Sequence, residues 1–115
     1  MGRNTQEHSN LMRKIRLQAA DMGHTLFPNQ RYKGPIVRKG KITEAWADCG
    51  LCDGALDLIG YTNRGRFLTI DAKVGKDKPR PDQIGFANAV KASGGIAGFA
   101  WSVKDFIDIM TEQDI

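Results

Sequence analysis

The chain has 115 residues, the size of a single domain with one core, so we expect one domain over residues 1–115. It is 41% hydrophobic and 26% charged and has no apolar run near the ~18 residues of a membrane span, which excludes an ordinary membrane-spanning protein. The net charge is +4, with 15 Lys and Arg against 8 Asp and Glu in residues 1–80, and this excess favours a polyanionic partner such as nucleic acid.

The first predicted element is a helix from about Thr5 to Met22, ended by Gly23. Its apolar residues recur at spacings of three and four and form one stripe, namely Leu11, Ile15, Ala19 and Met22. Glu7 lies four residues before Leu11, so its carboxylate is expected at the edge of the core. This segment lacks the continuous apolar stretch of a secretory signal, so a cytoplasmic protein without a membrane partner is expected.

Residues 26–44 give mixed signals, because Pro and Gly break them into short extended pieces, with a hairpin expected around Ile36 to Ile42. Cys49 and Cys52 follow as a single CxxC pair. A structural zinc site needs four ligands, and only His8 and His24 are available to complete one. The pair is therefore interpreted as two ordinary thiols.

Two strands are predicted next, over residues 55–61 and 66–74, and the Asn and Gly between them favour a β-hairpin. A helix from Asp82 to about Ala92 follows, ended by Gly94-Gly95, and then a buried strand over residues 96–101. Ser102 can cap a last helix from Val103 to about Met110, whose apolar side is expected to be Phe106, Ile107 and Met110. The order predicts an α/β domain.

The predicted hairpin brings acids and a lysine together. Asp71 and Lys73 point the same way, opposite the apolar face of their strand, because side chains alternate. Asp57 lies between Leu56 and Leu58, so it also opposes the apolar face, and strand pairing can bring it near Asp71. Two carboxylates can hold Mg²⁺, which takes its remaining ligands from water and substrate phosphate. The set therefore predicts metal-dependent hydrolysis of phosphodiesters.

Two further residues complete this candidate site. Lys73 can orient or deprotonate the attacking water, or stabilise the reacting phosphorus by its charge. Gln83 shares a helix face with Phe86, Ala87 and Val90 and can reach over the same site. A helix-capping or structural amide is an equal alternative for Gln83.

The runs GLCDGALDLIG (50–60) and GRFLTIDAK (65–73), then Gln83 with Phe86, then Gly94-Gly95, resemble the VRR-NUC family of virus-type replication-repair nucleases. The resemblance covers nearly the whole chain, and Phe27-Pro28-Asn29 looks like a divergent form of a family Arg-Asn pattern. It implies a restriction-endonuclease-like PD-(D/E)XK fold, with a central mixed sheet flanked by helices.

The resemblance also implies roles. It assigns Asp57 to the first acidic position, Asp71 and Lys73 to the (D/E)XK pair, Gln83 to the helix glutamine and Glu7 to the acid of the first helix. The implied cofactor is Mg²⁺ or Mn²⁺, held by Asp57, Asp71, the backbone carbonyl of Ala72 and Glu7. Three features depart from the family pattern: Leu56 stands in place of Pro, Asp71 in place of the frequent Glu, and Pro79-Arg80-Pro81 in place of a polar cap.

The expected function is that of a DNA endonuclease selective for junctions or branched DNA, similar to Holliday junction resolvases and acting as a homodimer; a phage or mobile-element origin is what the resemblance suggests. The expected phosphate contacts, for which a merely solvated basic face is the alternative, are Arg31, Lys33, Arg38, Lys39, Lys41, Lys76, Lys78 and Arg80. Two rival functions stay open. One is a DNA-binding subunit with weak or no catalysis that acts with a partner protein. The other is an interaction module using Trp46, Trp101 and the acidic C-terminal helix.

Overall fold

The elements follow one another much as the sequence predicts. The structure, a computed structural model, describes residues 5–30 and 32–114. Its elements are α1 (Thr5–Asp21), β1 (Thr25–Pro28), β2 (Tyr32–Arg38), β3 (Lys41–Cys49), β4 (Leu58–Tyr61), β5 (Phe67–Ala72), α2 (Pro81–Ala92), β6 (Ile96–Ala100) and α3 (Val103–Gln113). None of the helices in the described part of the chain has the length and apolar character needed to cross a bilayer.

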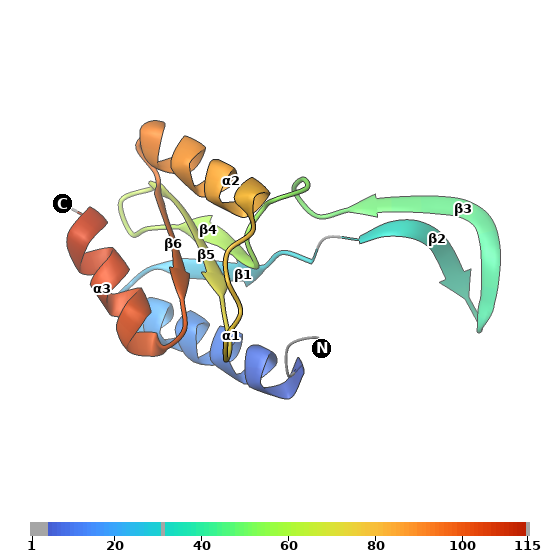
Figure 1. Cartoon of the computed structure of the whole chain (residues 1–115), viewed down its shortest axis with the longest axis horizontal. Helices are drawn as coiled ribbons and strands as arrows, with labels where there is room; N and C mark the ends of the chain where they lie inside the picture. Colours follow the sequence, from blue (N-terminus) through green and yellow to red (C-terminus); the bar gives the residue numbers. More distant parts are fainter. Residues whose placement is uncertain (1–4, 31, 115) are drawn as a thin grey trace.

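A four-stranded mixed sheet in the order β1-β4-β5-β6 forms the centre of the molecule (Figure 1). The β4–β5 pair is antiparallel, as the predicted hairpin requires; the β1–β4 pair is also antiparallel, and the β5–β6 pair is parallel. Parallel strands need a crossover connection, and α2 provides it. The predicted mixed α/β architecture, with helices on both faces of the sheet, is confirmed.

The hydrophobic core lies on the two faces of this sheet. Helices α1 and α3 cover one face, and the large cluster between them and the sheet is formed by Ile15, Ala19, Leu26, Leu58, Leu68, Ile70, Ala72, Ile96, Ala100, Phe106 and Met110. Helix α2 covers the other face with a smaller cluster around Leu56, Ala87 and Ala97. Because both faces are covered, the alternate residues of β5 that face α2 are buried as well.

Two predicted helix faces need correction. Phe106 and Met110 are buried as expected, but Ile107 is exposed, and Ile109 packs against the core in its place. Residues 106, 109 and 110 are spaced by three and four, so they share the face toward the sheet, and residue 107 falls outside it. In α1, Ile15 is buried as predicted, but Glu7 is exposed rather than at the core edge.

Strands β2 and β3 form a separate two-stranded sheet that projects from the body of the protein (Figure 1). This ribbon is the reason for the elongated shape, with extents of 48 × 28 × 28 Å. The sequence placed a hairpin around Ile36 to Ile42, and the turn does lie there, at Lys39-Gly40. The hairpin is longer than predicted, because pairing continues to Tyr32 and Cys49 past an irregularity between Pro35 and Val37.

Candidate active site

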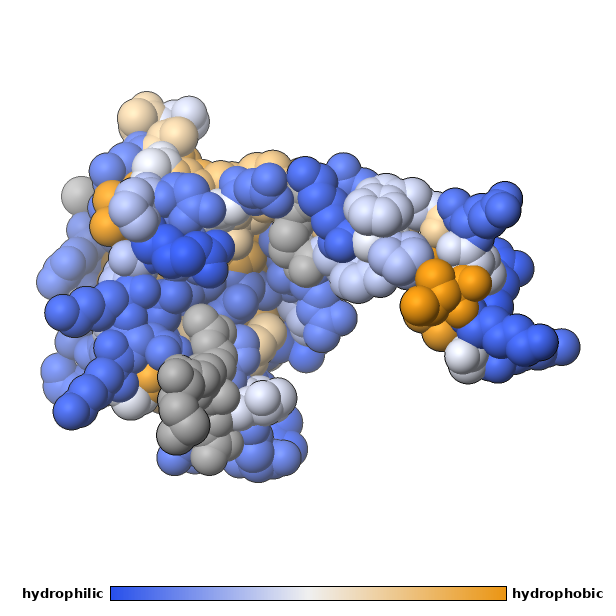
Figure 2. Space-filling model, turned by 45° about the vertical axis from the view of Figure 1, so that its right-hand side comes forward, coloured by the Kyte–Doolittle hydropathy of each residue, from blue (hydrophilic) through white to orange (hydrophobic). Residues whose placement is uncertain are grey.

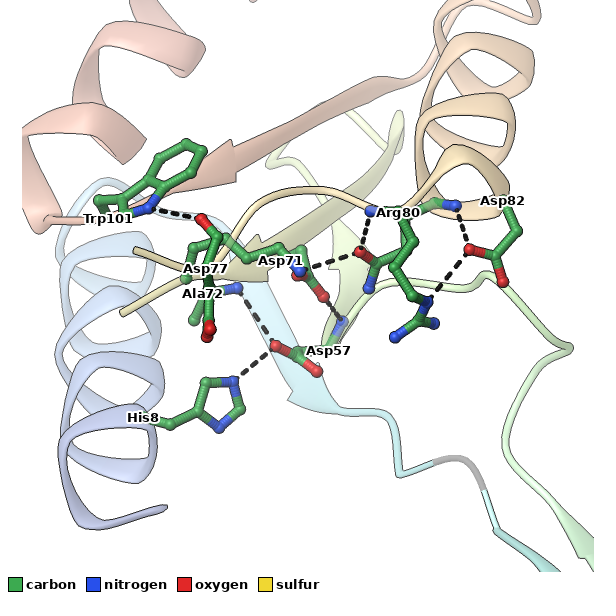
Figure 3. Close-up of polar contacts among 10 residues, drawn as sticks. His8, Asp57, Asp71, Ala72, Asp77, Arg80, Asp82 and Trp101 are labelled. Carbon is green, nitrogen blue, oxygen red and sulfur yellow. Dashed lines mark hydrogen bonds and ion pairs between the residues drawn. The ribbon is translucent and has the colours of Figure 1, made fainter. Parts of the chain in front are cut away.

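Asp57 and Asp71 meet where strands β4 and β5 diverge (Figure 3). Asp57 immediately precedes β4, whose first paired residue is Leu58, so the expectation that it sits within the strand is wrong. The Asp57 backbone N–H donates to Asp71 Oδ1 at 3.0 Å, and the Ala72 backbone N–H donates to Asp57 Oδ2 at 3.3 Å. Each carboxylate is thus held by the other segment, and the structure brings the two predicted acids together.

Asn29 fixes the segment that carries Asp57. Its backbone N–H donates to the Asp57 carbonyl at 2.7 Å, and its side-chain amide donates to the Leu56 carbonyl at 3.2 Å. Its side-chain oxygen accepts from the Leu51 N–H at 3.1 Å. Asn29 follows the end of β1, so these bonds tie the irregular segment before β4 to the edge of the sheet.

Gly54 seats the same segment against helix α2. Its φ of +84° lies in the left-handed region that favours glycine, and a Cβ there would stand 2.8 Å from the Asp82 carbonyl oxygen. A side chain at this position would therefore push the loop away from α2. Because Asp57 is three residues further on, the close approach at Gly54 helps to set its position.

Lys73 is buried beside Asp71. Residues 71 and 73 are 0% and 1% exposed, and Lys73 Nζ lies 2.8 Å from Asp71 Oδ2. The ammonium also donates to Gln83 Oε1 at 2.9 Å. The Lys73 backbone N–H donates to the Ala100 carbonyl at 2.9 Å, which extends the pairing with β6 and fixes the lysine. A buried lysine is costly unless its charge is paired, and here it is.

Gln83 has two roles. Besides accepting from Lys73, its Oε1 accepts from the Arg80 backbone N–H at 3.1 Å, which caps the first turn of α2. Pro81 occupies the first helical position, where its missing N–H has no cost, so Pro79-Arg80-Pro81 starts the helix without a polar cap at residue 80. The capping role and the contact with the candidate site therefore coexist in one amide.

The pKa of the Asp71 carboxyl is raised above its ordinary value of 3.8. Burial is the largest cause, because it removes water from the charged form, and the nearby charge of Asp57 raises it further. The charge of Lys73 opposes both effects. Asp71 Oδ2 has no aligned hydrogen-bond donor among the described residues, although Lys73 lies at ion-pair distance.

His8 is the member of this site that the sequence analysis missed. Its Nε2 lies 2.7 Å from Asp57 Oδ2, so a proton on Nε2 is donated to the carboxylate (Figure 3). His8 precedes Ile15 by seven residues and Leu11 by three, a spacing that makes it a candidate for the apolar face of the helix beside Glu7. Glu7, the predicted helix acid, instead lines a different depression with Lys14 and Trp101. Its role as a metal ligand stays a prediction.

A hollow of about 690 Å³ opens over the site. Its lining includes His8, Asp57, Arg80 and Gln83, with Asn29 on the side toward the projecting ribbon. Asp71 and Lys73 are buried behind Asp57 and Gln83. Of the two acids, Asp57 therefore lines the hollow, whereas Asp71 is completely buried.

The donor set fits a hard divalent cation. The described residues contain no group of three or more His, Cys, Asp or Glu side chains arranged as a metal cage. Mg²⁺, however, is commonly held by one or two carboxylates, with waters and substrate phosphate completing the set. Asp57 and Asp71 supply the carboxylates, and Asp71 Oδ2 is paired with the Lys73 ammonium at 2.8 Å.

The predicted phosphate contacts fall into two groups. Those on the β2–β3 ribbon are Lys33, Arg38, Lys39 and Lys41, and those on the loop before α2 are Lys76, Lys78 and Arg80. All are exposed, and Arg80 also lines the hollow. Arg31 lies outside the described residues.

The remaining predicted features are separate from the site. Cys49 ends β3 and Cys52 lies in the following loop, and both are exposed. Trp46 lies on the ribbon, whereas Trp101 follows β6 and donates its indole N–H to the Asp77 carbonyl at 3.2 Å. The two tryptophans are thus on different parts of the molecule.

Comparison of the chain with models of protein families and with curated proteins gives no match. The chemistry of the site is therefore the basis for assigning a function.

Proposed function

We propose that this protein is a metal-dependent DNA endonuclease of the PD-(D/E)XK class, which hydrolyses phosphodiester bonds. One observation carries the proposal: a buried Asp71–Lys73 ion pair stands next to a second carboxylate, Asp57, that opens into a hollow. Burying a charged pair does little for stability compared with an apolar pair of the same volume. Perturbed titratable groups behind a hollow are typical of a catalytic site.

The residues have distinct tasks in this reaction. Asp57 and Asp71 would hold Mg²⁺ or Mn²⁺, with the Ala72 carbonyl as a further oxygen donor. The bound ion would neutralise charge on the scissile phosphate and lower the pKa of a bound water. Lys73, fixed between Asp71 and Gln83, supplies a positive charge toward the reacting phosphate or orients the attacking water. His8 acts through Asp57 as a positioning residue.

The fold supports the class. Asp57 immediately precedes β4, Asp71 lies near the end of β5, and Lys73 follows β5; β4 and β5 are the two central strands of a mixed sheet covered by helices. Together with the sequence resemblance to VRR-NUC nucleases, this arrangement supports the proposed PD-(D/E)XK class. The resemblance extends the proposal to a homodimer acting on junctions or branched DNA, because a twofold dimer presents two sites to two strands.

The test is cleavage of a labelled panel: Holliday junction, flap, splayed arm, duplex and single strand, each with Mg²⁺, Mn²⁺ or EDTA. Wild type is compared with Asp71→Asn and with Asp21→Asn, a matched change at an exposed acid on α1. We expect metal-dependent cutting in wild type and Asp21→Asn and none in Asp71→Asn. Cutting by Asp71→Asn at the wild-type rate would overturn the site assignment.

A second candidate function is a DNA-binding subunit whose activity depends on a partner protein. The observation in its favour is that Asp71 and Lys73 are almost completely buried, so the site needs rearrangement before both acids reach a substrate. This candidate predicts DNA binding without turnover across the whole panel.

A further inference from the structure

The β2–β3 ribbon, residues 32–49, is called the arm below. Among the described residues its strands pair with each other and with no strand of the central sheet. An isolated two-stranded ribbon has little stability of its own in water. Because strand pairing with the central sheet does not stabilise the arm in the described part of the chain, contacts with a binding partner would explain why such a long ribbon projects from the protein.

The tip of the arm is a tight turn with three basic residues. Arg38, Lys39 and Lys41 are all exposed around Gly40. Lys39 has φ of +52° and Gly40 has φ of +77°, and such turns normally place Asn, Asp or Gly at both positions. Among the described residues, Lys39 is the only one other than glycine with positive φ. A lysine held in this unfavourable conformation keeps a positive charge at the outermost point of the arm, which suggests a functional constraint.

The apolar residues of the arm share its surface with these charges. Val37 and Ile42 face each other across the ribbon and are 57% and 76% exposed, and Trp46 on the same face is 68% exposed. Figure 2 shows hydrophobic surface near the end of the arm, bordered by hydrophilic residues. The arm carries four basic residues against two acidic ones, Glu44 and Asp48. Two such arms packed together would bring like charges close, whereas a polyanion would be attracted.

The shape of the arm fits a nucleic-acid groove. The major groove of B-DNA, about 12 Å wide, admits a two-stranded β-ribbon. Basic residues at the tip would contact phosphates, and the apolar face would contact base edges such as thymine methyl groups. The arm begins beside the candidate active site, because Asn29, Gln30 and Tyr32 line the same hollow as Asp57.

We propose that the arm inserts into a groove of duplex DNA and holds it at a fixed distance from the scissile phosphate, an inference that rests on the proposed nuclease function. Strand β2 has seven residues, and at about 3.3 Å per residue its length along the chain is roughly 23 Å, which is an upper limit on its reach because the arm bends (Figure 1). At about 3.4 Å per base pair, this length corresponds to at most roughly 7 base pairs between the base of the arm at Tyr32 and its tip. The arm therefore sets how much duplex the enzyme needs beside its cleavage point.

The test is DNA binding in EDTA, where no metal-dependent cleavage occurs. The arm variant is Arg38→Ala/Lys39→Gly/Lys41→Ala, in which Gly suits the left-handed backbone at residue 39. The control removes three exposed basic residues elsewhere: Arg64→Ala/Lys91→Ala/Lys104→Ala. Fluorescence anisotropy is measured on duplexes of increasing length and at several salt concentrations, and circular dichroism checks that each variant is folded.

We expect the arm variant to bind long duplex at least about tenfold more weakly than the control at physiological salt. A plot of the logarithm of its binding constant against the logarithm of the salt concentration should be less steep by up to about 2.7, since each of three lost phosphate contacts contributes about 0.9. Wild type should gain affinity as the duplex lengthens past the reach of the arm, and the arm variant should not. Equal binding by the arm variant and the control would overturn the proposal, as would no binding by wild type.

The same measurements separate this proposal from the nuclease proposal. Arm-dependent binding without any cleavage by wild type supports the arm and contradicts the nuclease. Metal-dependent cleavage by wild type, with equal DNA binding by the arm variant and the control, supports the nuclease and contradicts the arm. If Val37→Ser/Ile42→Ser converts a dimer to a monomer in light scattering and leaves DNA affinity unchanged, the arm is an interface between two copies and the proposal fails.

Discussion

Replacing Lys73 with Met removes one partner of the buried ion pair and leaves Asp71 without its counter-charge. Breaking a buried pair in this way costs about 3–5 kcal/mol, because the remaining charge has neither water nor a counter-charge beside it. Lys73 and Asp71 are 1% and 0% exposed, so solvent screening does not reduce this figure. For a domain of 115 residues, at about 4 °C per kcal/mol, the expected fall in Tm is about 12–20 °C.

The assay is urea and thermal unfolding in EDTA, followed by circular dichroism, for Lys73→Met, Asp71→Asn and the double variant. Because the double variant buries neither charge, we expect it to be more stable than the sum of the single losses predicts, by at least about 1 kcal/mol. Lys104→Met is the matched control, since its pair with Asp108 is exposed, and its Tm should be unchanged. Additive single losses would refute the reasoning that the buried pair is energetically coupled.

Four further predictions follow from the same site. Because the pKa of Asp71 is raised, the folded state binds the Asp71 proton more tightly than the unfolded state does. In EDTA, the free energy of unfolding of the wild type should therefore fall as pH rises from 3.8 through the raised pKa of Asp71. Urea unfolding of Asp71→Asn should show no such fall. Mg²⁺ or Mn²⁺ at a hundredfold excess over Kd should stabilise wild type by about 2.7 kcal/mol in thermal shift, and an equal gain in Asp57→Asn would contradict its role as a ligand. His8→Ala should weaken metal affinity about 10-fold in titration calorimetry, with partial rescue by His8→Gln. Gly54→Ala should lower the free energy of unfolding in urea by about 1–3 kcal/mol, because a Cβ there would meet the Asp82 carbonyl. Gly65→Ala is the control, since Gly65 also has positive φ but no neighbour within 4 Å, and it should lower the free energy of unfolding less. Equal losses would rule out the contact with Asp82 as the cause.

Much of the fold and of the site is local in origin, and the sequence predicts it. Alternation along residues 67–73 places Asp71 and Lys73 on one side of a strand, because side-chain direction has a period of two residues. The stripe of α2 places Gln83 toward the same side for the equivalent helical reason. Ser102 caps α3 as predicted, accepting from the Asp105 N–H at 3.1 Å. The strand alternation, the helix stripe and the Ser102 cap all depend on residues close together in the chain, within two positions of a strand or two turns of a helix.

The rest depends on contacts between segments far apart in the chain. Whether His8 or Glu7 meets Asp57 is set by the rotation of α1 on the sheet, and a stripe starting at Leu11 does not fix its first turn. Asp57 leaves the ladder because Asn29, from the end of β1, holds its segment. Lys73 is buried only because α2 folds back over the sheet and supplies Gln83. Sequence alone therefore determined which residue types could form the site and which way most of them point. Tertiary packing decided their burial and pairing, because a side chain is buried or paired only when a second strand or helix packs against its own.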